Sequence, residues 1–319
     1  MMPVEYQITI AFLLDFIMGD PRWFPHPVKI IGRAAIALEK PMRVIFRNTR
    51  FAGVMTAFTI IAVSAGLTTL LLFMARQIHP FMADVLGIII IYTTLAARDL
   101  QRHSIRVFRA LKSGDLPEAR KALSMLVGRD TEELDEPQIV RGVVESVAEN
   151  LVDGVTAPLF FAIIGGPVGA IIYKAINTLD STFGYKTPRY LLFGWASARI
   201  DDLANWLPAR LTTPCIVIAA ALMGKNFAGA VRIARRDGLK HDSPNSGISE
   251  AAFAGALGVQ LGGLNYYNGE AHYGQLIGDS VITLDRYHIR KANTLMYLSA
   301  ILFGLIGIII RMAFFSIIG

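Results

Sequence analysis

Carboxylates recur at helical spacing in the middle of the chain, where Arg141, Glu145, Glu149 and Asp153 follow one another every four residues. At roughly 100° per residue these side chains fall within about 120° of one helix face, with valines opposite. A solvated helix with an Arg141–Glu145 pair has this pattern. However, the acids run directly into an uncharged segment, and ionisable groups at membrane depth are usually functional. A Mg²⁺ site is the alternative, because Mg²⁺ prefers oxygen ligands.

A second polar group follows the next uncharged run. Lys174, Asn177, Asp180 and Ser181 share one helix face, and Lys186 lies a few residues beyond. Two lysines around an amide and a carboxylate suit the binding of a phosphate together with a metal. The alternative is an ordinary helix end that the following glycine closes.

A third group contains Arg199, the adjacent pair Asp201 and Asp202, and Asn205. Adjacent side chains point about 100° apart on a helix, so both aspartates chelate one ion tightly only where a helix begins. Asp201 and Asn205 align one turn apart. A solvated helix start is the alternative interpretation.

A fourth group precedes an apolar helix and contains Lys240, His241, Ser243, Asn245 and Ser246. Asn245 or Ser246 is a natural N-cap residue, which makes a helix cap the plain interpretation. The functional alternative is that the same exposed N–H groups bind a phosphate or a carboxylate, with Lys240 and His241 nearby.

Asp20 and His26 flank a proline-rich turn after the first apolar helix. A carboxylate and a histidine at a membrane edge suit a metal or a phosphate. The alternative is a turn that closes the first helix.

The composition of the 319 residues limits the elements that can position these groups. Hydrophobic residues make up 53% and charged residues 18%, against about 45–50% and about 25% in soluble domains. An ordinary soluble enzyme, a disordered chain and a disulfide scaffold are therefore disfavoured. The single cysteine, Cys215, lies in an apolar run and is expected in the core. The formal net charge of +6 is explained by cytoplasmic loops and does not imply nucleic acid.

Uncharged runs long enough to cross a membrane are Phe51–Ala75 and Ala292–Ile310. Ala251–Gly269 is also uncharged, and we expect it to exit the membrane. The shorter runs Val85–Ala97 and Leu211–Gly224 can be partial, re-entrant or buried. Gly154–Tyr173 carries Gly-Gly-Pro at its centre, which favours a broken helix, and we favour re-entry over a single crossing.

These patterns predict an all-α, polytopic integral membrane protein with about 4–6 membrane segments. The whole chain, residues 1–319, forms one membrane domain, in which residues 98–250 are mostly a cytoplasmic or re-entrant helical region carrying most polar motifs. Basic residues before Phe51 indicate that this side is cytoplasmic. Sequence motifs of the P-loop, dinucleotide, zinc-protease and serine-hydrolase kinds are absent.

The polar segments, in this order, resemble one family, the adenosylcobinamide-phosphate synthases (cobinamide synthases) of cobalamin biosynthesis. The motifs that carry the resemblance are Gly19-Asp20 with His26-Pro27-Val28, Val127–Thr131, Val144–Gly154, Tyr173–Ser181, Ser197–Asp202, Ser243–Ser246 and Gly262–Tyr267. The resemblance extends from end to end of the chain. Leu264 stands where the family is expected to have proline, which is a small departure.

The resemblance implies a multi-pass enzyme of the inner (cytoplasmic) membrane whose active site faces the cytoplasm. Such enzymes join the f-propionate carboxyl of adenosylcobyric acid to (R)-1-amino-2-propanol or its O-phosphate, giving adenosylcobinamide or its phosphate. ATP is the cosubstrate and Mg²⁺ the cofactor. The lipid bilayer and other membrane enzymes of the late corrin pathway are the further partners, and nucleic acid is not one. Whether the amine is phosphorylated stays open.

Amide formation from a free carboxylate needs activation, which metal-held phosphates and nearby cations support. Matching residues to that chemistry predicts a single site. The catalytic candidates are Glu145, Glu149, Asp153, Asp180, His26 and His241. The metal-ligand candidates are Glu149, Asp153, Asp180, Asp201 and Asp202. The substrate- or phosphate-binding candidates are Asn150, Lys174, Asn177, Ser181, Lys186, Arg199, Ser243, Asn245 and Ser246.

Two other classes of protein share some of these features. Broken Gly/Pro segments and intramembrane acids also occur in membrane transporters, which often have inverted repeats. The sequence shows no such repeat. A regulatory membrane protein related to the enzymes would be expected to lose the acidic positions, and all of them are present.

Overall fold

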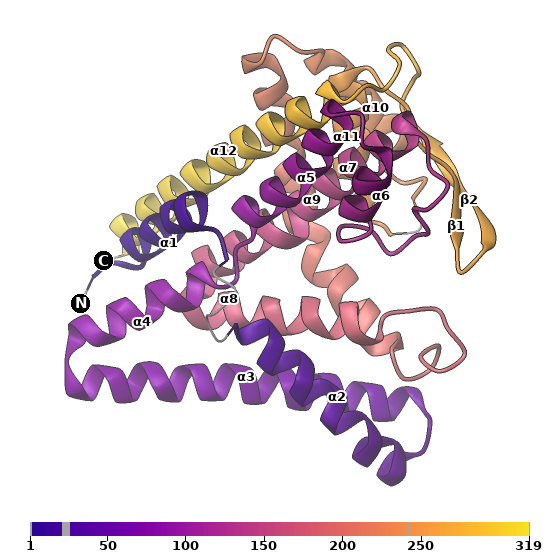
Figure 1. The fold of residues 1–319 in the computed structure, drawn as a ribbon. Helices are drawn as coiled ribbons and strands as arrows, with labels where there is room; N and C mark the ends of the chain where they lie inside the picture. Colours follow the sequence, from indigo (N-terminus) through magenta and orange to yellow (C-terminus); the bar gives the residue numbers. More distant parts are fainter. Residues whose placement is uncertain (1, 21–25, 242, 319) are drawn as a thin grey trace. The chain divides into compact units, whose positions relative to one another are not determined.

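The computed structural model of the chain describes residues 2–20, 26–241 and 243–318, and it is mainly helical (Figure 1). The helices are α1 (Val4–Met18), α2 (Pro27–Phe46), α3 (Arg50–Ile78), α4 (Pro80–Tyr92), α5 (Ala97–Lys112), α6 (Leu116–Leu123), α7 (Glu136–Leu151), α8 (Ala157–Phe183), α9 (Trp195–Leu222), α10 (Phe227–Asp237), α11 (Ser246–Leu257) and α12 (Tyr287–Ile318). A π-helical turn, Val152–Thr156, joins α7 to α8. Two antiparallel strands, β1 (Leu261–Tyr267) and β2 (Glu270–Ile277), complete the described elements.

Among the described residues, four helical stretches are long and apolar enough to cross a membrane: Arg50–Ile78, Pro80–Lys112, Glu136–Phe183 and Tyr287–Ile317. The prediction of an all-α polytopic membrane protein is therefore confirmed, and four lies within the predicted range. Whether Gly154–Tyr173 crosses or re-enters the membrane stays a prediction.

The expected membrane exit at Ala251–Gly269 is wrong. Helix α11 ends at Leu257, because Gly258 adopts a left-handed conformation with φ of 69°. The rest of the run forms β1 and the hairpin turn, in which Asn268 and Gly269 both have positive φ. Glycine, asparagine and tyrosine make this segment uncharged without making it apolar, so absence of charge alone is a poor membrane signal.

The chain divides into two compact units, each built from separate stretches of sequence. Unit 1 consists of residues 1–96, 153–205 and 306–319. Unit 2 consists of residues 97–152 and 206–305. The predicted 98–250 region is thus shared between the two units, and the boundary after Val152 falls inside the π-helical turn.

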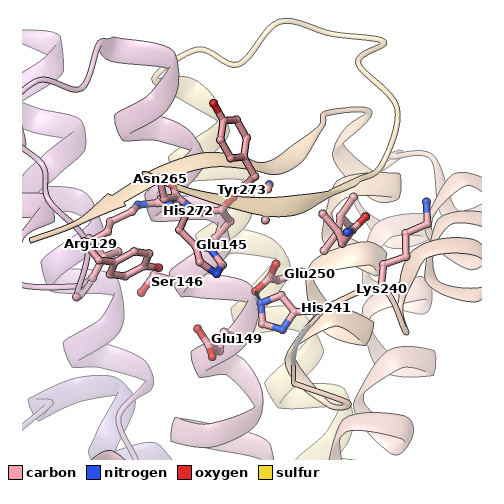
Figure 2. A pocket seen from close by; sticks show the side chains of 18 of the residues that line it. Arg129, Glu145, Ser146, Glu149, Lys240, His241, Glu250, Asn265, His272 and Tyr273 are labelled. Carbon is pink, nitrogen blue, oxygen red and sulfur yellow. Dashed lines mark hydrogen bonds and ion pairs between the residues drawn. The ribbon is translucent and has the colours of Figure 1, made fainter. Parts of the chain in front are cut away.

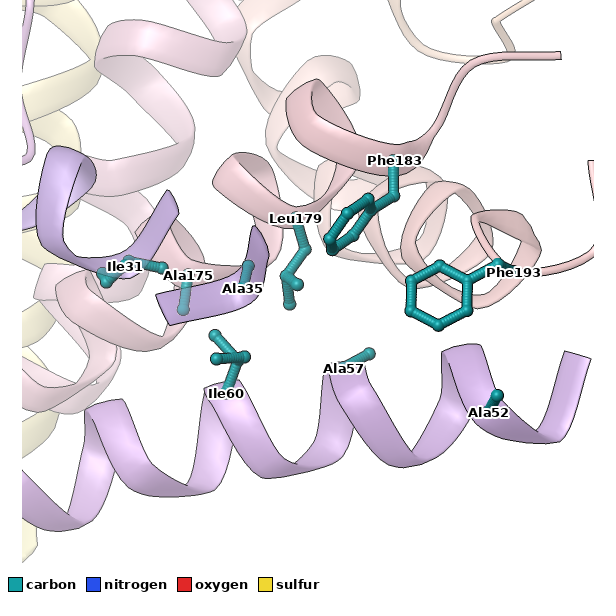
Figure 3. Close-up of a cluster of buried hydrophobic side chains, with 9 residues drawn as sticks. All are labelled: Ile31, Ala35, Ala52, Ala57, Ile60, Ala175, Leu179, Phe183 and Phe193. Carbon is teal, nitrogen blue, oxygen red and sulfur yellow. The ribbon is translucent and has the colours of Figure 1, made fainter. Parts of the chain in front are cut away.

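The core of unit 1 lies where α2, α3 and α8 pack together (Figure 3). Small side chains such as Ala35, Ala57 and Ala175 let the helix backbones approach closely, and Leu179 and Phe183 fill the space beside them. Helix α8 is interrupted at Gly166, whose φ of 58° lies outside the helical region, directly before Pro167. The predicted break in this helix is confirmed.

Unit 2 packs α7 between α5, α6 and α11, with α10 against α11. Asp135 and Gln138 form a capping box that fixes the start of α7. The inward face of α7 is apolar, as the valines of the sequence predict, and Val143, Val144 and Val147 are fully buried. The polar face of α7 is therefore left for the pocket described next.

Candidate active site

A cavity of about 450 Å³ in unit 2 gathers polar side chains from five segments (Figure 2). Helix α7 contributes Glu145, Ser146 and Glu149, and Arg129 comes from the loop before it. The α10–α11 connection contributes Lys240 and His241, and α11 contributes Glu250. The hairpin adds the residues Gly262, Asn265, Tyr267, His272, Tyr273, Gly274 and Gln275.

Glu145 is held from three sides. Its carboxylate accepts hydrogen bonds from the Arg129 guanidinium at 2.8 Å and from the Gly262 N–H at 2.7 Å. The Arg141 guanidinium lies 3.7 Å away as the predicted i,i+4 partner. Both arginines also donate to Asn265 Oδ1, at 2.5 and 2.8 Å. These contacts connect α7 to β1, and they balance the negative charge of Glu145 within the protein.

Glu149 and Glu250 have much poorer partners. Glu149 accepts one hydrogen bond, 3.1 Å long, from the Ser246 hydroxyl. Glu250 is 5% exposed, and its nearest charged partner among the described residues is His241 Nε2 at 3.9 Å. Burial raises the pKa of Glu250 well above its ordinary value, and the neighbouring Glu149 and Glu145 raise it further.

The two predicted histidines both use one ring nitrogen locally. His241 Nδ1 accepts a hydrogen bond from the Ser243 N–H at 3.0 Å, and His26 Nδ1 accepts one from Val28 at 3.3 Å. In the neutral ring the proton is then on Nε2. His26 Nε2 faces Asp20 at 3.3 Å, which places this predicted pair together. Both rings therefore present a donor rather than an acceptor.

The start of α11 is capped by Ser243. Its hydroxyl accepts hydrogen bonds from the N–H groups of Asn245 and Ser246, both 3.3 Å long. Asn245 occupies the predicted N-cap position, but its side chain does not cap the helix, and its Oδ1 accepts from Arg210 at 3.3 Å. The N–H groups of Asn245 and Ser246 are thus used within the protein.

Unit 1 contains the second polar group. Asp201 Oδ2 accepts a hydrogen bond from Asn205 at 2.9 Å, and Asn205 Oδ1 accepts one from the Tyr173 hydroxyl at 2.9 Å. Asp201 Oδ1 is buried and receives no hydrogen bond within the described residues. Burial raises the pKa of Asp201 to about 7, and Asp180 adds to this effect, whereas Asn205 and Asn177 oppose it.

Lys174 of α8 belongs to the same group. The charges that act on its ammonium include those of Asp153, Asp20, Asp15 and Asp201. Its carboxylate neighbours thus come from α1, the π-helical turn and α9 as well as from the loop before residue 21. The structure therefore brings together acids that are far apart in the sequence.

The remaining predicted residues lie outside these two groups. Ser181, Lys186 and Arg199 are exposed. Arg199 lies 3.4 Å from Asp202, whose pKa is raised by partial burial and lowered by Arg199. Asn150 donates to the Ser146 carbonyl one turn earlier in α7.

Comparison with known proteins gives the family of the chain. A family described as CobD/Cbib protein matches residues 8–296. The chain belongs to the CobD/Cbib family. Two relatives named "Cobalamin biosynthesis protein CobD" come from Geobacter metallireducens (52% identical, 91% of each chain covered) and Leptospira interrogans (48% identical, 94% of this chain and 95% of the relative). A third, from Clostridium perfringens, is 44% identical over 96% of this chain and 97% of its own.

Membership of the CobD/Cbib family places the chain in cobalamin biosynthesis. No solved structure matches the chain.

Among the described residues of this CobD/Cbib chain, no group of three or more His, Cys, Asp or Glu side chains is arranged to hold an ion by itself. Mg²⁺ in phosphate-transferring enzymes typically takes one or two carboxylates, several waters and substrate phosphates. The buried Oδ1 of Asp201, which lacks a donor, fits that smaller ligand set.

Several pocket residues were not predicted as site residues. Arg129 and Asn265 lie inside motifs that carry the family resemblance, so their position in those motifs was the available signal. Glu250 is an acid at the start of an alanine-rich run, where a buried charge is costly and indicates function. His272 and Tyr273 lie on β2, just beyond the run expected to exit the membrane, and no sequence motif identified them.

Proposed function

We propose that this CobD/Cbib protein is an adenosylcobinamide-phosphate synthase, an ATP-dependent amide synthase. It joins the f-propionate carboxyl of adenosylcobyric acid to (R)-1-amino-2-propanol or its O-phosphate. The observation that carries the proposal is the group around Lys174, in which an ammonium and several carboxylates are held together with the buried, donor-free oxygen of Asp201. A cation and hard oxygen ligands are what a nucleotide phosphate with its metal requires.

The reaction we propose has two balanced steps. The corrin carboxylate attacks the γ-phosphorus of ATP, forming a C–O–P bond and releasing ADP. The amine nitrogen then attacks the acyl carbon, the C–N bond forms and inorganic phosphate leaves. The ammonium loses two protons overall, of which one goes to phosphate and the other to a base on the protein.

In this proposal the polar residues of unit 1 bind the phosphates of ATP and their metal ion. Lys174 binds a transferring phosphate oxygen and stabilises the charge that develops there. Asp201, with Asp180 as a second carboxylate, would hold Mg²⁺, which would neutralise phosphate charge when bound. The exposed Lys186 and Arg199 and the half-buried Asp202 form a second set of phosphate contacts or ligands at the edge of the group.

The same proposal implies which membrane contains the protein and on which side of that membrane the reaction occurs. ATP is cytoplasmic, so the active site faces the cytoplasm from the cytoplasmic membrane. A Thr182→Cys variant should then react only with membrane-permeant thiol reagents in whole cells. Labelling by an impermeant reagent would place this end of α8 on the outer side and would overturn the re-entrant interpretation of Gly154–Tyr173.

The deciding experiment uses the purified full-length protein in detergent. Incubation with adenosylcobyric acid, ATP, Mg²⁺ and aminopropanol, or its phosphate, should yield a corrin with the mass of the amide and one ADP per amide. Asp180→Asn should abolish both products, whereas Glu133→Gln, which changes an exposed loop acid, should keep them. Normal turnover by Asp180→Asn, or a wild-type protein that makes no amide, would refute the proposal.

A further inference from the structure

The cations of the unit 2 pocket are already neutralised by the protein. Arg129 pairs with Glu145 at 2.8 Å, and Lys240 pairs with the fully buried Asp237 at 2.7 Å. Three glutamates line the cavity against one arginine and one lysine. The pocket is therefore poorly suited to a polyanion such as a nucleotide triphosphate, and its charge balance favours a cation.

Glu149 and Glu250 are the two remaining acids of the cavity (Figure 2). Within the described part of the chain, neither forms an ion pair with lysine or arginine. Glu250 is 95% buried by area, lines the cavity and accepts no hydrogen bond there, since His241 Nε2 at 3.9 Å is beyond hydrogen-bond distance. A buried carboxylate without a donor is costly unless a ligand supplies one.

The arrangement distinguishes between kinds of cation. No three His, Cys, Asp or Glu side chains among the described residues are grouped to hold a metal ion by themselves, so a metal in this pocket would need further ligands from a substrate. A primary ammonium instead needs three hydrogen-bond acceptors around one nitrogen. Glu149 and Glu250 provide two of them, and the Ser246 hydroxyl, which donates to Glu149 at 3.1 Å, has free lone pairs for the third.

We infer that Glu149 and Glu250 bind the primary ammonium of the amine substrate, in the pocket between α7, α11 and the hairpin. This inference rests on the proposed amide synthesis, and it assigns the amine to unit 2 and its recognition to a carboxylate pair. The same carboxylates lie beside the nitrogen when it must lose a proton, which makes them the nearest acceptors. Both histidines, in contrast, present Nε2–H.

The test compares a ligand that carries the ammonium with one that lacks it. Wild-type protein in detergent is titrated with 1-amino-2-propanol and with 1,2-propanediol, and with the O-phosphate of each, in the absence of ATP. Wild type should prefer the amine in each pair by about 100-fold, because the ammonium forms charge-assisted hydrogen bonds to buried carboxylates that the hydroxyl cannot replace. Glu149→Gln and Glu250→Gln should each lose most of this preference.

In turnover assays the same variants should raise KM for the amine about 100-fold, with KM for ATP and for adenosylcobyric acid unchanged. The matched control is Glu133→Gln, which should behave as wild type. A folding defect would instead lower the yield of active protein and leave the preference of the remaining sites intact.

The outcomes separate the two proposals. If wild type makes the amide but the variants keep both the amine preference and the amine KM, the ammonium site is refuted. Variants that raise KM for ATP rather than for the amine would also refute it. If wild type makes no amide yet loses its amine preference on mutation of either glutamate, the proposed function falls and the ammonium site stands.

Discussion

Glu145 in unit 2 and Asp201 in unit 1 are both acids that the sequence selects, yet their surroundings are opposite. Glu145 receives N–H donors from Arg129 and Gly262 and has Arg141 nearby. Asp201 has a neutral amide on one oxygen and no donor on the other within the described residues. The protein has supplied a paired arginine for Glu145, whereas Asp201 interacts with the charge of Lys174 but forms no ion pair within the described residues.

This difference separates a carboxylate that maintains the fold from one that can serve a ligand. A charge already satisfied by buried arginines gains little from a substrate, and its loss leaves those arginines unpaired. A buried carboxylate with an open lone pair is costly to the fold, and such costs are common at functional sites. Mutating each acid to its amide should therefore separate stability from activity.

The largest expected effect is on catalysis at Asp201. Asp201→Asn should lower the rate of amide formation about 1,000-fold, equivalent to about 4 kcal/mol, because a metal ligand near the phosphates is lost. Its thermal stability in detergent should be equal to or above that of wild type, since a buried charge facing Asp180 is removed. A variant with normal turnover, or one that unfolds at lower temperature, would reverse our assignment of Asp201.

The next effect is on folding at Glu145. Glu145→Gln should destabilise the protein by about 3 kcal/mol, because Arg129, whose side chain is 5% exposed, loses its counter-ion in a buried place. The measurement is the midpoint of thermal unfolding, with Glu133→Gln as the control for loss of an exposed acid. Full stability combined with lost activity would mean that Glu145 acts on the substrate directly.

The sequence predicts features that depend on neighbours along one helix. The Arg141–Glu145 pair, the Asp201–Asn205 alignment and the break in α8 all follow from helical spacing or from Gly-Pro chemistry. The division of the polar residues between two units does not follow from helical spacing, because it depends on tertiary packing. Spacing places Glu149 and Asp153 on one helix face, although Glu149 lines the unit 2 pocket and Asp153 belongs to unit 1.

The hairpin shows a second reason why part of the site is not predicted from the sequence. A criterion based only on the absence of charged residues does not distinguish apolar residues from uncharged polar ones. For this reason the sequence places Asn265 in a membrane segment. The partners of Asn265 are Arg129 and Arg141, more than a hundred residues away in sequence. Contacts at that separation have no local signal in one sequence.

A smaller effect concerns Asp237, a second acid that the protein has neutralised. Arg236 and Lys240 donate to it at 2.7 Å, and the Gly278 N–H donates at 2.8 Å. The Arg236 hydrogen bond is the largest cause of a lowered pKa for this fully buried carboxylate. We expect Asp237→Asn to cost about 2 kcal/mol of unfolding free energy at pH 7.

The sign of the pH dependence follows from that lowered pKa. A carboxylate with a folded-state pKa below its unfolded value stabilises the fold above the unfolded value and loses this contribution as the pH falls toward the folded value. The stability gap between wild type and Asp237→Asn should therefore be full above about pH 5 and shrink below about pH 4. A gap that is independent of pH would show that the ion pairs do not carry the effect.

The smallest effect tests whether the hairpin is part of the unit 2 pocket or only adjacent to it. Gly269 lies in the β-turn with φ of 81°, and a Cβ there would meet no atom within 4 Å. Gly269→Ala therefore adds only backbone strain, which costs about 1 kcal/mol. Gly114, between α5 and α6, has φ of 77° and the same open surroundings, so Gly114→Ala is a control of equal strain.

Both glycine variants should unfold at similarly lowered temperatures, but only Gly269→Ala should change ligand binding. The Gly269 N–H donates to Asp130 at 2.7 Å, and the same turn sets the pairing of Asn265 with His272, both of which line the pocket. We expect a rise of about threefold in KM for the amine from Gly269→Ala, measured at a temperature where both variants are folded. An equal rise from Gly114→Ala would mean that general destabilisation, rather than the position of the hairpin, controls the pocket.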